Sequence, residues 1–600
     1  MNSSLQLAKS PLFQLRSAGR PLNERIRLTF ERAKAVAHAY ALTSDDVLNM
    51  TEKFWKMHTD PAAAVMDGAA SVLLTLQYNL CAGTLAMFAV KQPDVNEVLQ
   101  EVLSFEVSGQ FLLTEVAHGL DAIHIETTAT LLPNGDWDLN TPREQAAKYM
   151  PPTAPAGTPC VAVVFAKAII NGEDCGIRPF VVHIHDGKDM HPGVVSKLLP
   201  QRGGSRPVHH SITYFHHVRL PKTALLGSPE KPADPRATFF HGIFRVAVGT
   251  LAIGTFCVPV LQASAYIAGR YSMRRTVVDV DGGLKPIISF RTQKIPVLTA
   301  LAQSVAIEAW MNKAIAMFRD TSLDGRVRHA IAAISKVVMI QHTMDAGLVL
   351  ADRCGAQGLF EVNQITGMFS DMRGAVIAEG DLLGISIRLA SELLLKRYAV
   401  PSTSDPTSLL AKHEAGMFEE LRGLLAGMRH HRSADFDLYI LPECLSLIQA
   451  IGHRMVYDAA VAANLDACLV DLYVASCVKL DSAWYVEKLG VSRRAQRDME
   501  NKAIDAVYPR LEEFLDKLAL DPYITAPIFS EDRWERFVNS LPTFPPSRGF
   551  RDDSAAYAAA GHRLPAPAAG DDFGSGSGGL GLVLGAQAMS KGGDMAVSKL

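Results

Sequence analysis

The sequence predicts an α+β protein in which helical segments flank a separate β-rich segment. Residues 22–107 show helical apolar periodicity, which returns at 237–396 and again at 408–541. Between them, residues 111–226 carry short β-rich runs separated by turn formers such as Asn171-Gly172. A single hydrophobic core stops growing at roughly 250–300 residues. A chain of 600 residues is therefore expected to fold into several packed domains.

Changes of composition set the expected domain limits. A polar break, PSTSDP at 401–406, separates two helical blocks, and a Gly-rich stretch at 570–579 cannot bury enough apolar surface to offset its ordering entropy. We expect, in order, an N-terminal helical domain at 1–110, a middle β domain at 111–228, a helical bundle at 229–402, a second C-terminal helical domain at 403–545 and a flexible tail at 546–600.

Charge and cysteine content exclude several classes of function. The formal net charge is -3 and the pI is about 6.7, so no basic surface for nucleic acid is predicted. The eight cysteines form no CxxC pair and read as reduced thiols. The pairs His209-His210 and His216-His217 do not suggest a metal site, because adjacent residues on a strand point to opposite faces.

One stretch is long enough to cross a membrane. Residues 246–269 contain no charged side chain. The same stretch contains Pro259, Gln262 and Ser264, and a helix that is apolar all round is also typical of the core of a large protein. We therefore expect a buried helix and no membrane span.

The last three residues, Ser598-Lys599-Leu600, match the peroxisomal import tripeptide. They follow the Gly-rich stretch, which would serve as a spacer that presents the signal to a receptor. The sequence thus predicts a peroxisomal location and an import receptor as a partner.

An ordered series of motifs carries a resemblance to a known family. These motifs are TEVAHGLD at 114–121, ETTAT at 126–130, AVVFA at 162–166, VRLPKTALL at 218–226 and RYSMRR at 270–275. The acyl-CoA oxidases and the related acyl-CoA dehydrogenases carry similar motifs in the same order. The chain resembles this family over about residues 73–397 and more weakly to about 541. A β domain alone would explain single strands, but not ordered motifs that span three domains.

The resemblance implies an acyl-CoA dehydrogenase-like fold, with a helical N-terminal domain, a middle β-barrel and C-terminal helical bundles. It also implies FAD as cofactor. The residues that would contact FAD are Thr114, Gly119, Arg274, Gln293, Gly355 and Gly358. Thr114 offers a hydroxyl group, Gly119 allows close backbone approach, and Arg274 has the fork geometry that suits a pyrophosphate.

The loop CGAQG at 354–358 resembles a family loop that reaches the cofactor of a neighbouring subunit. This resemblance implies a homodimer. Taken alone, a Gly-x-x-Gly loop after a helix is more often a C-cap and a turn.

Glu379 is the predicted catalytic base. In AVIAEGD at 375–381 it occupies the place of the family glutamate that removes the α-proton of an acyl thioester. Its neighbours Ile377 and Leu382 are apolar, and an apolar environment raises the pKa of a carboxyl group toward working pH. A surface glutamate at the start of a helix is the alternative.

The predicted activity is that of an FAD-dependent acyl-CoA oxidase. The enzyme would convert an acyl thioester into a trans-2-enoyl thioester, and molecular oxygen would reoxidise the flavin and yield hydrogen peroxide. Three alternatives stay open: a dehydrogenase-like pathway enzyme, a relative acting on a non-thioester substrate, and a catalytically silent acyl-binding partner subunit.

Several positions depart from the family pattern. Leu120 stands where the family has a small polar residue, and Pro152 and Ala356 stand where it has glycines. The asparagine that follows the Glu-Gly pair in the family is replaced within Asp381-Leu382. An aromatic residue is also missing near the double arginine, where Val277-Val278 follow instead. We expect a specialised acyl substrate that is not an ordinary straight-chain fatty acyl group.

Overall fold

The computed structural model describes residues 3–15, 17, 19–431 and 433–544. The described residues up to Arg536 form one compact unit. The predicted tail at 546–600, with its import tripeptide, lies outside the described residues.

The N-terminal segment folds into short helices with well-formed caps. Thr43 begins one of them and accepts a hydrogen bond from the Asp46 N–H, while Asp67 accepts one from the Ala70 N–H. The helices are α1 (Ser3–Lys9), α2 (Pro11–Gln14), α3 (Leu22–Tyr40), α4 (Ser44–Asn49), α5 (Glu52–His58), α6 (Pro61–Ala64), α7 (Gly68–Leu74), α8 (Gly83–Ala89) and α9 (Asn96–Leu103).

A π-helix, η1 (Thr75–Ala82), joins α7 to α8 without a break. Turns of this kind are rare and are frequent at functional sites. Here the π-helix buries the amide side chains of Gln77 and Asn79. Gln77 Nε2 donates to the Val102 carbonyl oxygen at 2.7 Å, whereas Asn79 faces the central helix of the bundle.

The middle segment is built from two sheets. The larger has strand order β1-β5-β2-β3-β9 with β6 paired to β5, and the smaller has order β4-β8-β7. The strands are β1 (Ser108–Leu112), β2 (Thr128–Leu131), β3 (Trp137–Asn140), β4 (Lys148–Tyr149), β5 (Cys160–Ile170), β6 (Glu173–His185), β7 (Val194–Leu198), β8 (Ser211–Phe215) and β9 (Val218–Leu220).

The hairpin between β5 and β6 confirms a turn predicted from the sequence. Asn171 and Gly172 both have positive φ, as a tight hairpin turn requires. The two sheets enclose an apolar core of their own that includes Trp137, Phe180 and Phe215. This core is separate from the core of the helices.

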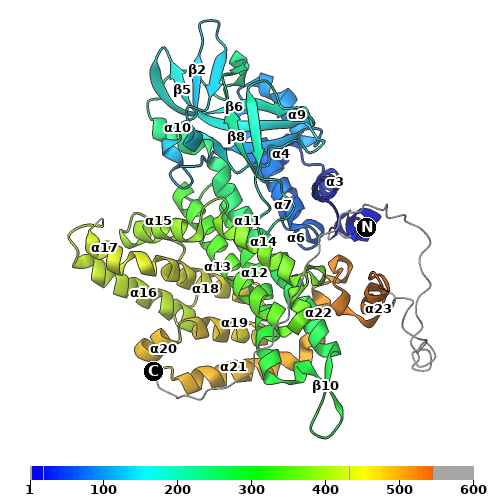
Figure 1. Cartoon of the computed structure of the whole chain (residues 1–600). Coiled ribbons are helices and arrows are strands. Elements are labelled where there is room, and N and C mark those ends of the chain that lie inside the picture. Colours follow the sequence, from blue (N-terminus) through cyan, green and yellow to red (C-terminus); the bar gives the residue numbers. More distant parts are fainter. Residues whose placement is uncertain (1–2, 16, 18, 432, 545–600) are drawn as a thin grey trace, which may run out of the picture. The chain divides into compact units, whose positions relative to one another are not determined.

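The C-terminal part is an array of long helices, and Figure 1 shows it beside the β segment. They are α10 (Pro235–Gly242), α11 (Phe244–Arg274), α12 (Arg291–Arg319), α13 (Gly325–Arg353), α14 (Ile365–Ile377), α15 (Leu382–Leu394), α16 (Leu409–Ala426), α17 (Ala434–Tyr439), α18 (Cys444–Ala462), α19 (Ala467–Leu480), α20 (Ser482–Leu489), α21 (Arg493–Val507), α22 (Leu511–Lys517) and α23 (Glu531–Asn539). A small hairpin, β10 (Thr276–Val278) and β11 (Leu284–Pro286), follows α11.

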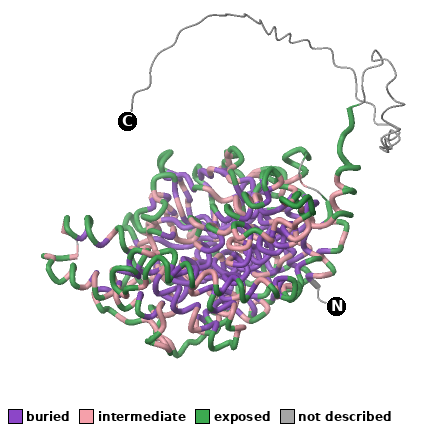
Figure 2. Tube along the Cα trace, turned by 90° about the horizontal axis from the view of Figure 1, so that it is seen from below, coloured by how far each residue is buried: buried purple, intermediate pink, exposed green. Residues whose placement is uncertain are grey.

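The central helix is α11, which packs against both α12 and α13. The uncharged stretch predicted to be a buried helix lies inside it. By length and composition, Gly68–Ala89 and Pro235–Arg274 could each cross a membrane, and 67% of each apolar window is buried inside the protein. Figure 2 shows buried residues throughout the interior of the chain, with exposed residues around them.

The predicted order of helical, β and helical segments is confirmed. One apolar cluster continues from the N-terminal helices into the C-terminal array. The limits proposed for the individual domains stay predictions.

Candidate active site

Glu379 lies in the short turn between α14 and α15. Its φ is +53° and that of Gly380 is +101°, so two successive residues adopt left-handed backbone conformations. Such a conformation is unfavourable for a residue with a side chain. Asp381 then begins α15, and its carboxylate accepts hydrogen bonds from the N–H groups of Leu383 and Gly384, both at 3.0 Å.

The carboxyl group of Glu379 points into the helices, although the residue as a whole is partly exposed. A Cβ added to Gly249 on α11 would lie 1.1 Å from Glu379 Oε2, so the carboxylate occupies a notch that only glycine leaves open. Asn79 Nδ2 on the π-helix lies 3.4 Å from the same oxygen. The carboxylate is therefore enclosed between η1 and α11.

Two cations and a hydroxyl group surround this turn. Lys336 Nζ on α13 donates to the Ala378 carbonyl oxygen at 2.5 Å and to that of Gly380. Thr250 Oγ1 on α11 donates to the Glu379 carbonyl oxygen at 2.9 Å. Arg245 is fully buried beside Asn79, to whose carbonyl oxygen its Nε donates at 2.9 Å.

Burial shifts the pKa values of Glu379, Lys336 and Arg245. Burial raises the pKa of Glu379 to about 8, although the charges of Lys336 and Arg245 pull it down. Burial also lowers the pKa of Lys336 to about 8 and that of Arg245 to about 9. A carboxyl group whose pKa lies near neutral pH is suited to general acid–base chemistry.

The predicted loop at 114–121 leaves the end of β1 and faces the Glu379 turn. The Thr114 hydroxyl group donates to the Tyr149 carbonyl oxygen. Gly119 has open space where a Cβ would be. Leu120 is 77% exposed, and its Cδ1 lies 3.5 Å from where a Cβ on Gly384 would be, which brings this loop against the start of α15.

Large apolar side chains are exposed on both sides of this junction. On the β segment they are Val116, Leu120, Ile123 and Tyr149, and beside Glu379 they are Ile377 and Leu383. Of these side chains, Leu120 is the one whose position against the start of α15 the geometry gives directly. Exposed apolar side chains that lie together are typical of binding surfaces.

The other predicted cofactor residues lie at the opposite end of α11. Arg274 donates to the Glu531 carboxylate and to the Ile528 carbonyl oxygen. Gln293 is buried, and its Nε2 donates to Ser272 Oγ at 2.8 Å and to the Arg353 carbonyl oxygen at 3.0 Å. In this chain, both side chains already have protein partners.

The glycines predicted nearby shape the loop that follows α13. Gly355 has φ +61°, in the left-handed region that favours glycine. A Cβ on Gly358 would lie 1.9 Å from the Ala351 carbonyl oxygen, so only glycine fits there. Both are explained by local backbone geometry, and their contact with a cofactor stays a prediction.

The length of α11 separates the two groups of predicted residues. Arg274 lies 25 residues beyond Gly249 on this helix, which at about 1.5 Å per residue is roughly 37 Å. The structure therefore brings Thr114, Gly119 and Glu379 to one region. It does not bring Arg274, Gln293, Gly355 and Gly358 to the same region within one chain.

The sequence analysis missed the residues that hold Glu379 in place: Asn79, Arg245, Gly249, Thr250 and Lys336. One signal was available for Lys336, a lone lysine within the apolar run AAISKVVMI of a long helix. Gly249 and Thr250 gave no signal, because they lie within an uncharged stretch that reads as core.

A group that could hold a metal ion lies among helices of the C-terminal array. One ring nitrogen each of His342 and His453 and the Cys477 sulfur lie within 4.8 Å of one another, and all three residues are buried. These residues are widely separated in the sequence, so spacing gave no hint of the group.

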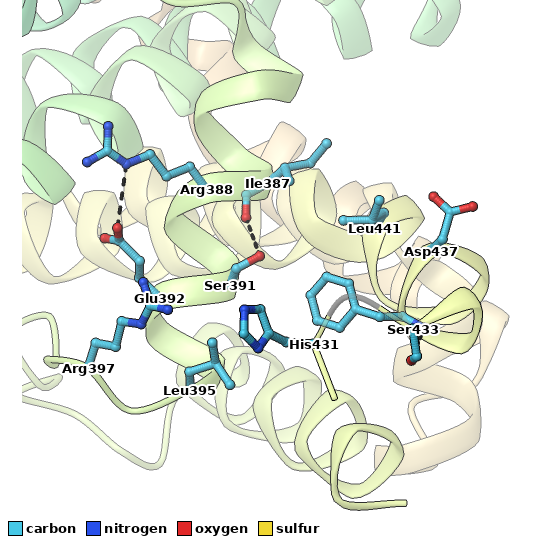
Figure 3. A pocket seen from close by; sticks show the side chains of 11 residues that line it. Ile387, Arg388, Ser391, Glu392, Leu395, Arg397, His431, Ser433, Asp437 and Leu441 are labelled. Carbon is cyan, nitrogen blue, oxygen red and sulfur yellow. Dashed lines mark hydrogen bonds and ion pairs between the residues drawn. The ribbon is translucent and has the colours of Figure 1, made fainter. Parts of the chain in front are cut away.

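A cavity of about 460 Å³ lies between α15 and the segment around α17 (Figure 3). Ile387 and Ser391 line it from α15, and Arg388 forms an ion pair with Glu392 at its edge. Its lining does not include Glu379, so we assign it no part in the site.

Part of this chain matches the model of a known protein family. Residues 249–394, which include Gly249, Lys336 and Glu379, match the family model described as acyl-CoA oxidase, C-alpha1 domain. The human peroxisomal acyl-coenzyme A oxidase 3 is 27% identical over 411 residues, which are 62% of this chain and 57% of that protein. The Arabidopsis thaliana peroxisomal acyl-coenzyme A oxidase 2 is 26% identical over 56% of this chain and 52% of its own length. The matches thus span about half the length of these relatives.

Solved structures confirm the predicted fold. Acyl-CoA oxidase 1 of Yarrowia lipolytica superposes with a TM-score of 0.78 at 18% identity, covering 92% of this chain and 91% of that one. Acyl-CoA oxidase-2 of Caenorhabditis elegans, bound with FAD, ascaroside-CoA and ATP, gives a TM-score of 0.68 at 15% identity over 89% and 96%.

Proposed function

Since this chain is a relative of the acyl-CoA oxidases and carries their C-alpha1 domain, we propose that it oxidises an acyl thioester with bound FAD. The product is the trans-2-enoyl thioester, and oxygen takes up the electrons as hydrogen peroxide. The observation that carries the proposal is the enclosed Glu379 carboxyl group on a rigidly held turn, with a pKa of about 8.

The residues of this chain supply the proton transfer. Glu379 removes the α-proton of the thioester, and its raised pKa makes the carboxylate a stronger base than an exposed glutamate. Asn79 Nδ2, at 3.4 Å, is a long contact, so this amide leaves the carboxylate able to accept a proton. When bound, FAD supplies the acceptor for the hydride that leaves the β-carbon.

Residues on the β side fit such a cofactor. Gly119 leaves open space at the end of its loop, and the exposed apolar side chains at the junction offer a surface for the flavin ring. Thr114 holds the neighbouring backbone by donating to Tyr149. FAD is present in the related Caenorhabditis elegans acyl-CoA oxidase-2, which supports this choice of cofactor.

We propose a homodimer for a geometric reason. Arg274 lies roughly 37 Å along α11 from Gly249, which packs against Glu379, and this is too far for both ends to contact the same cofactor within one chain. Gln293, Gly355 and Gly358 lie near the Arg274 end, since Gln293 Nε2 donates to Ser272 and to the Arg353 carbonyl group. They would complete the site of a second copy. Arg274 would then release the Glu531 carboxylate and bind a phosphate group of the FAD held by that second copy.

The substrate is proposed to be a specialised acyl thioester. Leu120 is largely exposed and contacts the start of α15, so it narrows the approach to Glu379 where the family has a small polar residue. We also place the enzyme in the peroxisome, because the relatives it matches are named as peroxisomal acyl-coenzyme A oxidases.

One observation favours a second candidate. Arg274 is already paired with Glu531 and the Ile528 carbonyl group, as expected of a chain that does not load FAD and acts as a silent acyl-binding subunit. The visible spectrum of the purified protein separates the two functions. A yellow protein that an acyl thioester bleaches without oxygen, and that forms peroxide in air, is the enzyme. A colourless protein that takes up no FAD is the silent subunit.

A further inference from the structure

Lys336 lies inside the protein at the middle of α13 and has no exposed surface. Its ammonium group donates to two main-chain carbonyl groups, those of Ala378 and Gly380. These two residues stand directly before and after Glu379. The lysine thus bridges the turn that carries the predicted base.

Stability does not explain a lysine at this position. Removing an ammonium ion from water costs several kcal/mol, and apolar residues of similar volume are often equally good or better in such places. The surroundings of Lys336 on α13 are apolar, with Ile334, Val337 and Val338 all fully buried. A methionine would fill the same volume without a charge to bury.

The turn needs external support. Glu379 has φ +53°, and left-handed backbone costs a residue with a side chain roughly 1–2 kcal/mol. Thr250 holds the Glu379 carbonyl group, and Lys336 holds the carbonyl groups on either side. With three successive carbonyl groups held, the backbone from which the Glu379 side chain leaves is held as well.

We propose that Lys336 is the positioning residue of the Glu379 base: by binding the carbonyl groups of Ala378 and Gly380, it holds the turn that aims the carboxylate at the Gly249 notch. This inference rests on the proposed function. Lys336 itself touches neither substrate nor cofactor in this assignment, so it is a positioning residue and not a catalytic one.

The charged groups around Lys336 and Glu379 determine how the reaction rate depends on pH. Lys336 is faced by Glu379 and Asp381 from the turn and by Cys257 from α11. Glu379 is faced by Lys336 and Arg245, and both cations lower its pKa. Removal of the lysine charge therefore raises the pKa of Glu379 further and moves the rise of the reaction rate to higher pH.

The test compares Lys336→Met with Ser335→Ala in the full-length protein. Ser335 is the buried neighbour on α13, so its substitution controls for disturbance of the helix. We expect Lys336→Met to slow flavin bleaching by about 10²-fold, as misplacement by roughly 1 Å does. The KM for the thioester should change little, and the pH profile should move to higher pH. Ser335→Ala should match the wild type.

A second readout does not depend on activity. Hydrogen exchange of the peptide containing residues 378–384 reports whether the turn is held, with or without flavin. We expect exchange to be about tenfold faster in Lys336→Met and unchanged in Ser335→Ala. If Lys336→Met does not fold, Lys336→Arg keeps the charge, and its larger head should still slow bleaching and loosen the turn.

The outcomes separate this inference from the proposed function. Unchanged exchange and an unchanged pH profile in Lys336→Met would overturn the positioning role, even if Glu379→Gln abolishes bleaching. Bleaching that persists in Glu379→Gln would instead remove the base assignment, while the exchange result would still decide whether Lys336 holds the turn.

A different observation carries a second inference, at the group His342, His453 and Cys477. These residues lie on α13, α18 and α19, and none is more than 4% exposed. Gly452 allows α18 to approach α13 closely, since a Cβ there would lie 2.8 Å from the Val338 Cβ. The Nε2 atoms of both histidines are buried without a hydrogen-bond partner among the described residues.

Buried polar atoms without partners are costly, at about 1–3 kcal/mol each, and point to a bound water or ion. Two imidazole groups and a thiolate are the ligands that soft cations such as Zn²⁺ and Cu⁺ prefer. We infer that His342, His453 and Cys477 bind one such cation, with a structural role in joining the three helices.

Metal analysis of the purified full chain, produced with added zinc and copper, tests this inference and identifies the ion. A full equivalent of one metal is expected, and it should be lost in Cys477→Ser and in His453→Gln. Cys468→Ser is the matched control, because Cys468 lies on the same helix outside the group. Metal at background level in the wild type would overturn the site and leave a buried water as the partner of the histidines.

Discussion

The two ends of α11 differ in what their polar and small residues contact. Near its start, Gly249 and Thr250 face the Glu379 turn, one by leaving a notch and the other by donating a hydrogen bond. Near its end, Arg274 is bound by Glu531 and by the Ile528 carbonyl group of the same chain. The first end supports the enclosed Glu379 carboxyl group, whereas the second end pairs its arginine with groups of the same chain.

This difference shows what a motif can and cannot specify. Glu379 and Arg274 were both predicted from short sequence motifs. What each residue is able to do depends on groups far away in the chain: Lys336 on α13 for the glutamate, and Glu531 on α23 for the arginine. Breaking those contacts one at a time tests each end of the helix.

The largest effect is expected from Glu379→Gln. The amide keeps the shape of the side chain but cannot accept the α-proton, so bleaching of bound flavin by an acyl thioester should fall by about 10³-fold or more. Rapid-mixing absorbance without oxygen measures this rate. Flavin content should equal that of the wild type. Bleaching at the wild-type rate would show that another group is the base.

Gly249→Ala should have the next largest effect. The added Cβ would lie 1.1 Å from Glu379 Oε2 and must displace the carboxylate. We expect bleaching to slow by about 10–100-fold and the free energy of unfolding to fall by roughly 1–3 kcal/mol, as for other overpacked sites. Gly423→Ala on α16, where open space surrounds the position, is the control and should leave bleaching unchanged. Wild-type bleaching in Gly249→Ala would mean that the carboxylate works from outside the notch.

The sequence was sufficient for the architecture, for physical reasons. Helical and β periodicity repeat over many residues, so local errors average out, and Asn171-Gly172 marks its turn without reference to the rest of the chain. The supports of Glu379 are different. Asn79, Arg245 and Lys336 meet only through tertiary packing, and each looks like an isolated polar residue in an apolar helix.

The same reasoning explains why Gln293 and Arg274 were harder to interpret. Gln293 was predicted to contact FAD, yet its amide donates to Ser272 and to the Arg353 carbonyl group. The Glu531 partner of Arg274 lies in a C-terminal helix that no motif marked. A motif records the residue type, but not whether its hydrogen bonds are already made.

A pH dependence of stability is expected from the Glu379 end. The pKa of Glu379 is about 8 in the folded chain, whereas an unperturbed glutamate, as in the unfolded chain, has a pKa of 4.5. The folded protein therefore binds the proton more tightly than the unfolded chain does. The free energy of unfolding should therefore fall as pH rises from about 4.5 to 8, by an amount on the order of 1–3 kcal/mol from this group.

Urea unfolding of the wild type and of Glu379→Gln across this range measures that slope. Asp371, whose pKa is raised to about 7 mainly by desolvation, contributes in the same direction to both proteins and cancels in the difference. The shifted pKa of Lys336 acts only above about pH 8. Parallel curves for the two proteins would show that Glu379 ionises normally in the folded state.

The smallest effect is expected at the other end of α11, from Glu531→Gln. Glu531 is 74% exposed in its ion pair with Arg274, so its loss should change the free energy of unfolding by less than about 1 kcal/mol. If Arg274 serves a pyrophosphate of a second copy, release from Glu531 should tighten FAD binding by a few-fold, measured as the Kd in a fluorescence titration. Glu512→Gln removes a partner of Arg270 instead and is the matched control. Equal Kd values for both variants and the wild type would mean that the ion pair between Arg274 and Glu531 has only a structural role. The end of α11 near Glu379 would then be the only one of its two ends with a proposed part in the reaction.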